Sequence, residues 1–124
     1  MDITPSIPQN RQLITGYGND GFKINNEFIA GSLLVFSEKT MSWEIGASED
    51  FSLDHFEGLI RRADEIELVL IGTGQTMRPI PPAIHSHLKA HNIAVESMDT
   101  GAACRTFNVL MSEGRHVAAA LIAV

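Results

Sequence analysis

Short apolar stretches separated by polar turn residues fill the first third of the chain and predict β-strands. These stretches are residues 13–17, 22–24, 28–29, 32–36 and 41–45. Asn19-Asp20-Gly21 lies between two stretches and predicts a hairpin turn in which the glycine supplies the positive φ angle, and Asn25-Asn26 is a second turn signal. Apolar and polar residues alternate in the last stretch, so we expect Met41, Trp43 and Ile45 to share a face. We assign this face to the core, and the alternative is an exposed patch for a partner. The first third is therefore predicted to form antiparallel hairpins.

From residue 52 the pattern changes to helical segments that alternate with strongly apolar strands. The predicted helices are residues 53–63, a segment from Pro81-Pro82 to Asn92, and residues 102–112. The predicted strands are residues 66–71, 93–98 and 117–124. Ser52 suits the N-cap of the first helix, and proline suits the first turn of the second. Because a helix separates each strand from the next, we expect these strands to be parallel and their crossovers right-handed.

Together these elements predict a single three-layer α/β domain. A central mixed, mostly parallel sheet is expected from the C-terminal αβαβαβ unit, with the N-terminal antiparallel β hairpins added to it. Because the predicted strands are almost continuously apolar, we expect cover on both faces, from the helices and from the N-terminal β layer. Residues 1–12 contain two prolines and three Asn or Gln residues, so we assign them to an N-terminal arm and residues 13–124 to one domain.

Glycine and polar residues follow two of the predicted parallel strands, at the edge where ligands bind in open α/β sheets. One junction continues from the strand through a glycine-rich turn, and the other leads into the third helix. The candidate ligand-binding residues of this crevice are Gly72, Thr73, Gly74, Arg78, Asp99, Thr100, Cys104 and Arg105. Two helix N-termini and two arginines suit a small anion. The alternative at this stage is that the turn and the helix cap are purely structural.

The chain matches none of the common catalytic, nucleotide-binding or metal-binding signatures. Gly72 and Gly74 are not followed by the third glycine of the dinucleotide motif, nor by the Gly-Lys-Ser/Thr of a phosphate loop. Cys104 is the only cysteine, which excludes a disulfide or a cysteine-based zinc site within one chain, and we expect it to fill the core. His87 and His91 have helical spacing but no evident third ligand. We therefore expect no metal and no cofactor, and we lean towards a protein that is not an enzyme.

Charge and hydropathy limit the classes of partner that we expect for this chain. Nine Lys and Arg against fifteen Asp and Glu give a net charge of −6, which argues against nucleic acid as a partner. Glu65 and Glu67 flank a strand start, and we expect them to be solvated. The longest apolar run, residues 117–124, is too short for a membrane span, which needs about 20 residues. Residues 1–8 have neither the pattern of a secretory signal nor the Arg content of a transit peptide, so we expect a cytoplasmic protein.

Blocks of sequence in a fixed order resemble a known family over about residues 12–123. The blocks are Gly31-Ser32-Leu33-Leu34-Val35, Leu70-Ile71-Gly72-Thr73-Gly74, Pro81-Pro82, Ile93-Ala94-Val95-Glu96, Met98-Asp99-Thr100, residues 102–110 and Glu113-Gly114-Arg115. They are similar to the domain of unknown function 498/598 family, which includes mitochondrial complex I assembly factor 3 and an adipogenesis-associated protein. The resemblance implies a three-layer α/β domain with a mixed sheet and a protein-binding role in complex assembly. It implies no enzyme activity and no tested role for the crevice residues.

Two functional hypotheses follow, and a third concerns self-association. The first is a non-enzymatic interaction module with a protein partner, assisting assembly of a respiratory or membrane complex. The second is a protein that binds a small anion or polar ligand, or a weak enzyme, using the crevice between Gly72–Gly74 and Asp99–Arg105. The third is a homo-oligomer that forms through an exposed sheet edge, for which the final strand and residues 32–36 are the candidates.

Overall fold

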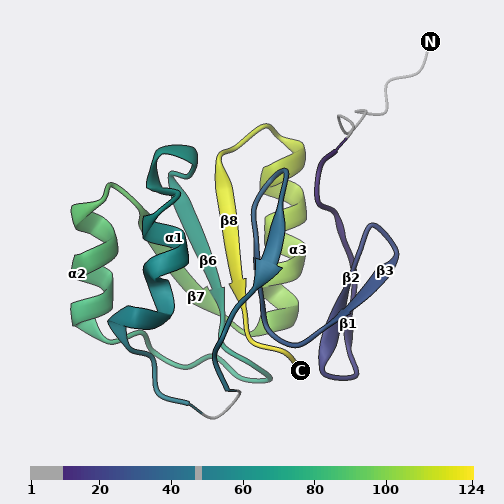
Figure 1. The fold of residues 1–124 in the computed structure, drawn as a ribbon, viewed down its shortest axis with the longest axis horizontal. Coiled ribbons are helices and arrows are strands. Elements are labelled where there is room, and N and C mark those ends of the chain that lie inside the picture. Colours follow the sequence, from purple (N-terminus) through teal and green to yellow (C-terminus); the bar gives the residue numbers. More distant parts are fainter. Residues whose placement is uncertain (1–9, 47–48) are drawn as a thin grey trace.

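The computed structural model describes residues 10–46 and 49–124, so most of the predicted N-terminal arm lies outside the described residues. The described part forms three layers, with a central sheet between two outer layers (Figure 1). This mixed α/β architecture confirms the predicted fold class.

A small antiparallel sheet forms part of one outer layer. It contains β1 (Ile14–Gly18), β2 (Gly21–Ile24) and β3 (Glu27–Ala30), in that spatial order. Asn19 and Asp20, between β1 and β2, have φ angles of 55° and 59°. The turn lies where the sequence predicts it, but Asn19 and Asp20 adopt the positive φ angles in place of Gly21, which is the first residue of β2. A two-residue turn of this type needs positive φ at both central positions.

The central sheet has five strands in the order β5-β4-β8-β6-β7. They are β4 (Leu33–Val35), β5 (Thr40–Ser42), β6 (Leu68–Gly72), β7 (Ala94–Met98) and β8 (Val117–Leu121). β6 is parallel to both β7 and β8, whereas β4 is antiparallel to both β5 and β8. The sheet is more evenly mixed than expected, because the second N-terminal hairpin joins it instead of staying in the outer layer.

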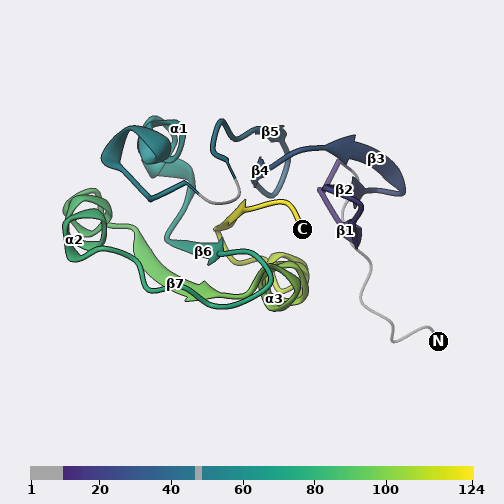
Figure 2. The ribbon, with the colours of Figure 1, turned by 90° about the horizontal axis from the view of Figure 1, so that it is seen from below.

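Side chains on the two faces of the central sheet belong to two separate cores. On one face α1 (Glu57–Ile60) and α2 (Pro82–Ala90) cover the strands, and the predicted apolar side of α2, Ile84 and Leu88, is buried there. On the other face α3 (Thr100–Ser112) and the small sheet provide the cover (Figure 2). Helices and an N-terminal β layer therefore both cover the sheet, as predicted.

The first predicted helix is not continuous, so the prediction of one helix over residues 53–63 is wrong. A 3-10 turn, η1 (Leu53–Phe56), precedes the single turn of α1, and a second 3-10 turn, η2 (Ala63–Glu65), follows it. Short helices are marginal, and glycine disfavours them further. Gly58 allows α1 to pack closely on β4, since a Cβ there would lie only 3.0 Å from Leu34 Cδ1. Packing on the sheet therefore decides this segment's shape.

The two strands expected at a sheet edge are both internal. β8 lies between β4 and β6, and β4 lies between β5 and β8. Self-association through the final strand or through residues 32–36 is therefore wrong, because each strand already has a partner on both sides. The outermost strands of the central sheet are β5 and β7.

Trp43 belongs to the core, as its alternating segment predicted, although β5 ends at Ser42. It is 5% exposed, and its ring packs against Phe51 and Phe56 at centroid distances of 6.4 and 5.7 Å. Its Nε1 donates a hydrogen bond of 2.7 Å to the carbonyl of His55. The indole thereby joins the segment after β5 to the η1 turn.

Candidate functional site

The turns that follow β6 and β7 lie side by side, as the predicted crevice required. The strands are paired in parallel with Gly72 opposite Met98, and the Thr73 amide donates to the Met98 carbonyl at 2.9 Å. The Thr100 amide donates to the carbonyl of Gly74 at 2.8 Å. Because these two turns bond directly to each other, they form a closed joint at this point of the edge.

Thr100 is the centre of this joint. Its side chain is fully buried; Oγ1 donates to the Ile122 carbonyl at 2.8 Å and accepts from the Gly74 amide at 2.9 Å. Gly72 allows this close approach, since a Cβ on it would lie 3.0 Å from the Thr100 Cα and from Leu121 Cδ2. The Thr100 hydroxyl, which the sequence predicts as a ligand-binding group, therefore connects the ends of three strands.

The N-terminus of α3 is largely occupied by its own cap. Asp99 Oδ1 accepts from the Ala102 amide at 2.9 Å, and the Asp99 carbonyl accepts from the Ala103 amide at 3.0 Å. The N-terminus of α2 begins at Pro82, which has no amide hydrogen. The two helices also cover opposite faces of the sheet. Their N-termini therefore offer an anion fewer converging donors than the sequence predicted.

Arg78 and Arg105 point to different neighbours. The Arg78 guanidinium lies over the Phe51 ring, 4.8 Å from its centroid, and Nε donates to the Thr73 carbonyl at 3.3 Å. Arg105 is exposed and donates through Nη1 to the Tyr17 hydroxyl of β1 at 2.9 Å. Of the eight candidate residues the structure joins Gly72, Thr73, Gly74, Arg78, Asp99 and Thr100, whereas it directs Arg105 to Tyr17 of β1.

Cys104 lies in the core between α3 and the sheet, as expected. It is 2% exposed, and burial raises the pKa of its thiol to about 12. A thiol with this pKa is almost wholly protonated near neutral pH, and the nucleophilic form is the thiolate. The environment of Cys104 is therefore that of a packing residue.

His87 and His91 contact each other on α2, with their ring centroids 5.4 Å apart. Within the described residues no group of three or more His, Cys, Asp or Glu side chains is placed to hold a metal ion. In the same part of the chain, no helix is both long and apolar enough to cross a membrane.

A pocket of about 440 Å³ lies at the opposite edge of the central sheet, where β6 and β8 begin. We call it the amino-edge pocket. Four segments line it: the residue that leads into β1, the β4–β5 turn, the stretch from η2 to β6, and the stretch from the end of α3 to β8. Its lining residues include Arg11, Phe36, Ser37, Glu38, Lys39, Arg62, Asp64, Glu65, Ile66, Glu67, Met111, Arg115, His116 and Val117. Its volume is in the range of ligand pockets, roughly 300–1,000 Å³.

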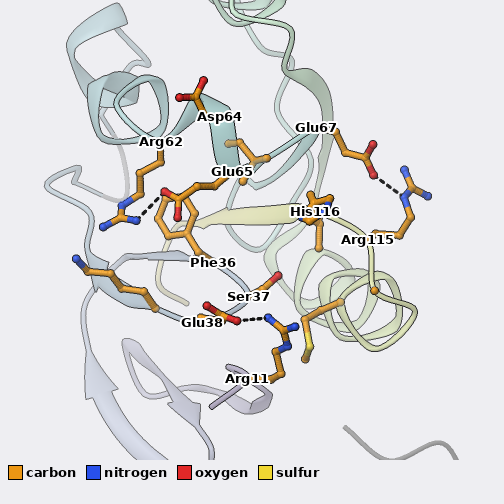
Figure 3. Close-up of a pocket in the computed structure, with 15 residues that line it drawn as sticks. Arg11, Phe36, Ser37, Glu38, Arg62, Asp64, Glu65, Glu67, Arg115 and His116 are labelled. Atoms are coloured by element: carbon orange, nitrogen blue, oxygen red, sulfur yellow. Dashed lines mark hydrogen bonds and ion pairs between the residues drawn. The ribbon is translucent and has the colours of Figure 1, made fainter. Parts of the chain in front are cut away.

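Three ion pairs form the rim of the amino-edge pocket, with Ser37 and His116 between them (Figure 3). The pairs are Arg11 Nη1–Glu38 Oε1 at 2.7 Å, Arg62 Nη1–Glu65 Oε2 at 2.8 Å and Arg115 Nε–Glu67 Oε1 at 2.8 Å. The hydrogen bond and charge of Arg115 lower the pKa of the Glu67 carboxyl below its ordinary value, although this pair is exposed. The carboxylates hold the arginines in place along the rim.

The pocket is electrically neutral in an acidic chain. Four of the nine basic and four of the fifteen acidic side chains line it, so the net charge of −6 comes from residues outside it. The floor is apolar and includes Ile66, Met111 and Val117, and the Arg62 guanidinium lies 5.3 Å from the centroid of the Phe36 ring.

Sequence reasoning missed this pocket. The expectation that ligands bind beyond the carboxyl ends of parallel strands directed attention to the opposite edge. The available signal was charged residues just before two strands. Glu65 and Glu67 precede β6, and Arg115 precedes β8. We expected the two glutamates to be solvated; both are exposed, and each is also paired with an arginine.

The fold and its sequence place the chain in a family. A family model described as "Protein of unknown function (DUF498/DUF598)" matches residues 14–122, and the chain belongs to this family.

A curated relative from Xenopus tropicalis is named "NADH dehydrogenase [ubiquinone] 1 alpha subcomplex assembly factor 3". It is 35% identical over 109 residues, which cover 88% of this chain and 60% of the relative. The chain therefore spans about three fifths of the length of that relative.

Two solved structures have the same fold. The crystal structure of an outer membrane protein from Bartonella henselae is 34% identical, with a TM-score of 0.85 over 93% of this chain and 97% of that one. A Bordetella pertussis protein described as a Mth938-like domain is 25% identical, with a TM-score of 0.82 over 98% of this chain and 92% of that one. The similarity therefore includes the small sheet as well as the central one.

Proposed function

We propose that this chain is a non-enzymatic interaction module that binds a protein partner during assembly of a respiratory complex of the NADH dehydrogenase class. The observation that carries the proposal is the 35% identity, over 88% of this chain, to a relative named as an assembly factor for NADH dehydrogenase. The matched region includes every strand and helix of the domain. The cytoplasmic location stays a prediction.

The burial and the hydrogen bonding of the reactive side chains support a binding role over a catalytic one. Cys104 is buried and its pKa is raised to about 12. The Thr100 hydroxyl is held between two backbone groups. The three ion pairs of the amino-edge pocket place arginines and carboxylates together on its rim, an arrangement suited to recognition of a protein surface.

The proposal is tested by native electrophoresis of membranes and cytosol from cells that make a tagged full-length chain. We expect the chain to migrate with a partly assembled NADH dehydrogenase and to be absent from the mature enzyme. A tagged α/β protein of the same size, made at the same level, is the control. Migration of the chain only as a free protein, in cells that are actively assembling the enzyme, would overturn the proposal.

A second candidate function is binding of a small anion beside Arg78. One observation favours it: Arg78 Nη2 is buried and has no hydrogen-bond partner among the described residues. Phosphate and carboxylates are the probes, and an anion that binds only the folded chain raises its melting temperature. We expect Arg78→Gln to remove such a shift. The absence of any shift with the wild-type chain would end this candidate.

A further inference from the structure

The rim of the amino-edge pocket is built for a ligand that carries both donors and acceptors. The guanidinium of each rim arginine has five N–H donors, and each carboxylate accepts up to about four hydrogen bonds. Each of the three ion pairs uses one nitrogen and one oxygen, as given above. Each pair therefore presents donors and acceptors side by side at the opening.

This arrangement disfavours a free ion. A phosphate at the opening would meet the carboxylates of Glu38, Glu65 and Glu67 as well as the arginines, and a metal cation would meet three guanidinium groups. A polypeptide backbone carries one N–H donor and one C=O acceptor on almost every residue and has no net charge. An extended peptide thus complements a neutral rim of paired donors and acceptors.

The floor of the pocket suits one large apolar side chain. Ile66, Met111 and Val117 line it, and methionine adapts its shape and makes favourable contacts with aromatic rings. Arg62 already lies over Phe36 with a half-buried side chain, 26% exposed, and a guanidinium plane can stack against a second ring on its other side. A volume of about 440 Å³ leaves room for an aromatic side chain and adjoining backbone.

We infer that the amino-edge pocket is the docking site for an uncharged segment of a partner protein, which inserts one aromatic side chain between Arg62 and the apolar floor. The inference rests on the proposed function, to which it adds the surface and the chemistry of the partner. Buried aromatic anchors surrounded by a polar ring that excludes water carry most of the energy in many protein interfaces. The three ion pairs form such a ring.

The test is an NMR titration of the isotope-labelled full chain with N-acetyl-L-tryptophanamide, which carries an aromatic side chain and two peptide groups. We expect saturable shifts of amide signals confined to residues 36–39, 62–67 and 111–117. N-acetyl-L-alaninamide has the same peptide groups without the ring, and inorganic phosphate is the anion probe. Both are expected to leave these signals almost unchanged.

Matched variants locate the binding. Ser37→Trp places a bulky ring in the pocket, and we expect it to weaken binding of the tryptophan amide about tenfold or more. Ser86→Trp makes the same change at an exposed position of α2 and is expected to have no effect. Should Ser37→Trp fail to fold, Lys39→Trp at the exposed rim serves the same purpose.

Three results would overturn the inference. They are the absence of saturable shifts, shifts centred on another surface, and undiminished binding to a folded pocket variant. A chain that migrates with assembling NADH dehydrogenase but shows one of these results would retain the proposed function and lose the proposed site. A chain that binds the tryptophan amide in the pocket but never migrates with the enzyme would retain the site and lose the partner class.

Discussion

Side chains that the sequence indicates as candidates for ligand binding have structural roles in this domain. Thr100 follows a parallel strand and begins a helix, a position typical of ligand sites in α/β sheets. Its hydroxyl instead bonds the Gly74 amide and the Ile122 carbonyl. Burial of a polar group requires such partners, because an unpaired buried donor or acceptor is costly.

Thr100→Val is therefore expected to destabilise the fold by about 1–3 kcal/mol. The substitution keeps the shape of the side chain but leaves the Gly74 amide and the Ile122 carbonyl without their partner. Urea unfolding measures the change. Thr76→Val, at an exposed position of the same edge, is the control and should change stability by less than about 0.5 kcal/mol. Equal stabilities of the two variants would contradict the role given to Thr100.

Cys104 should be unreactive in the folded chain. With a pKa raised to about 12 by burial, only about one thiol in ten thousand is ionised at pH 8. We expect almost no reaction with Ellman's reagent until urea unfolds the chain, and then rapid reaction. Fast labelling of the folded chain at pH 8 would show that the thiol is accessible and would contradict its role as a packing residue.

The Glu67–Arg115 pair predicts a small acid-dependent loss of stability. Arg115 lowers the pKa of Glu67 in the folded chain, so the pair stabilises the fold above the carboxyl's ordinary value of 4.5. That contribution disappears as the pH falls through the lower folded pKa. Urea unfolding between pH 6 and about pH 3 should show a shallower loss of stability for Glu67→Gln. Arg115→Gln should have the same effect, and the double variant should add nothing further.

At the scale of elements, one side chain joins the small sheet to α3. Asn108 Oδ1 accepts from the Ile14 amide at 2.9 Å, and its Nδ2 donates to the Ile14 carbonyl at 2.8 Å. The amide thus satisfies the backbone of a strand as a neighbouring strand would. Beside it, Phe22 and Ile24 pack into the same core as Phe107.

Asn108→Ala should loosen β1 more than it lowers the stability of the whole domain. We expect faster hydrogen exchange at the amides of β1 and a loss of about 1–3 kcal/mol in unfolding free energy. Val109→Ala, at the next and exposed position of α3, is the control. Unchanged exchange in β1 would mean that the Asn108 hydrogen bonds are not needed to hold the small sheet in place.

The local sequence pattern was sufficient to predict most helices, strands and turns. It was insufficient where tertiary packing decides the shape or the position of a segment. The Asn-rich turns and the buried side of α2 were predicted because positive φ and helical spacing are local properties. The division of residues 53–65 into three short elements was not, because it depends on how Gly58 packs against Leu34. Strand order was not predicted either, although the fully buried run of three alanines in β8 fits a central strand in contact with layers on both faces.

At the scale of the whole molecule, the predicted crevice and the amino-edge pocket lie at opposite edges of one sheet. The crevice could be predicted from sequence because the residues assigned to it follow the strands directly. The pocket could not be, because its rim joins Arg11, Glu38, Arg62 and Arg115, which are far apart in the chain. Only the folded chain brings these charges together, and they form the neutral rim of a pocket on an acidic protein.

The central claim, that the chain acts in assembly through a protein partner, is tested most directly by removing it from the cells that make it. The amount of fully assembled NADH dehydrogenase on native gels is the measurement, with total subunit synthesis held constant. The account predicts that this amount falls without the chain and returns when the wild-type chain or Ser86→Trp is supplied, but not when Ser37→Trp is supplied. An unchanged amount of assembled enzyme in cells without the chain would contradict it.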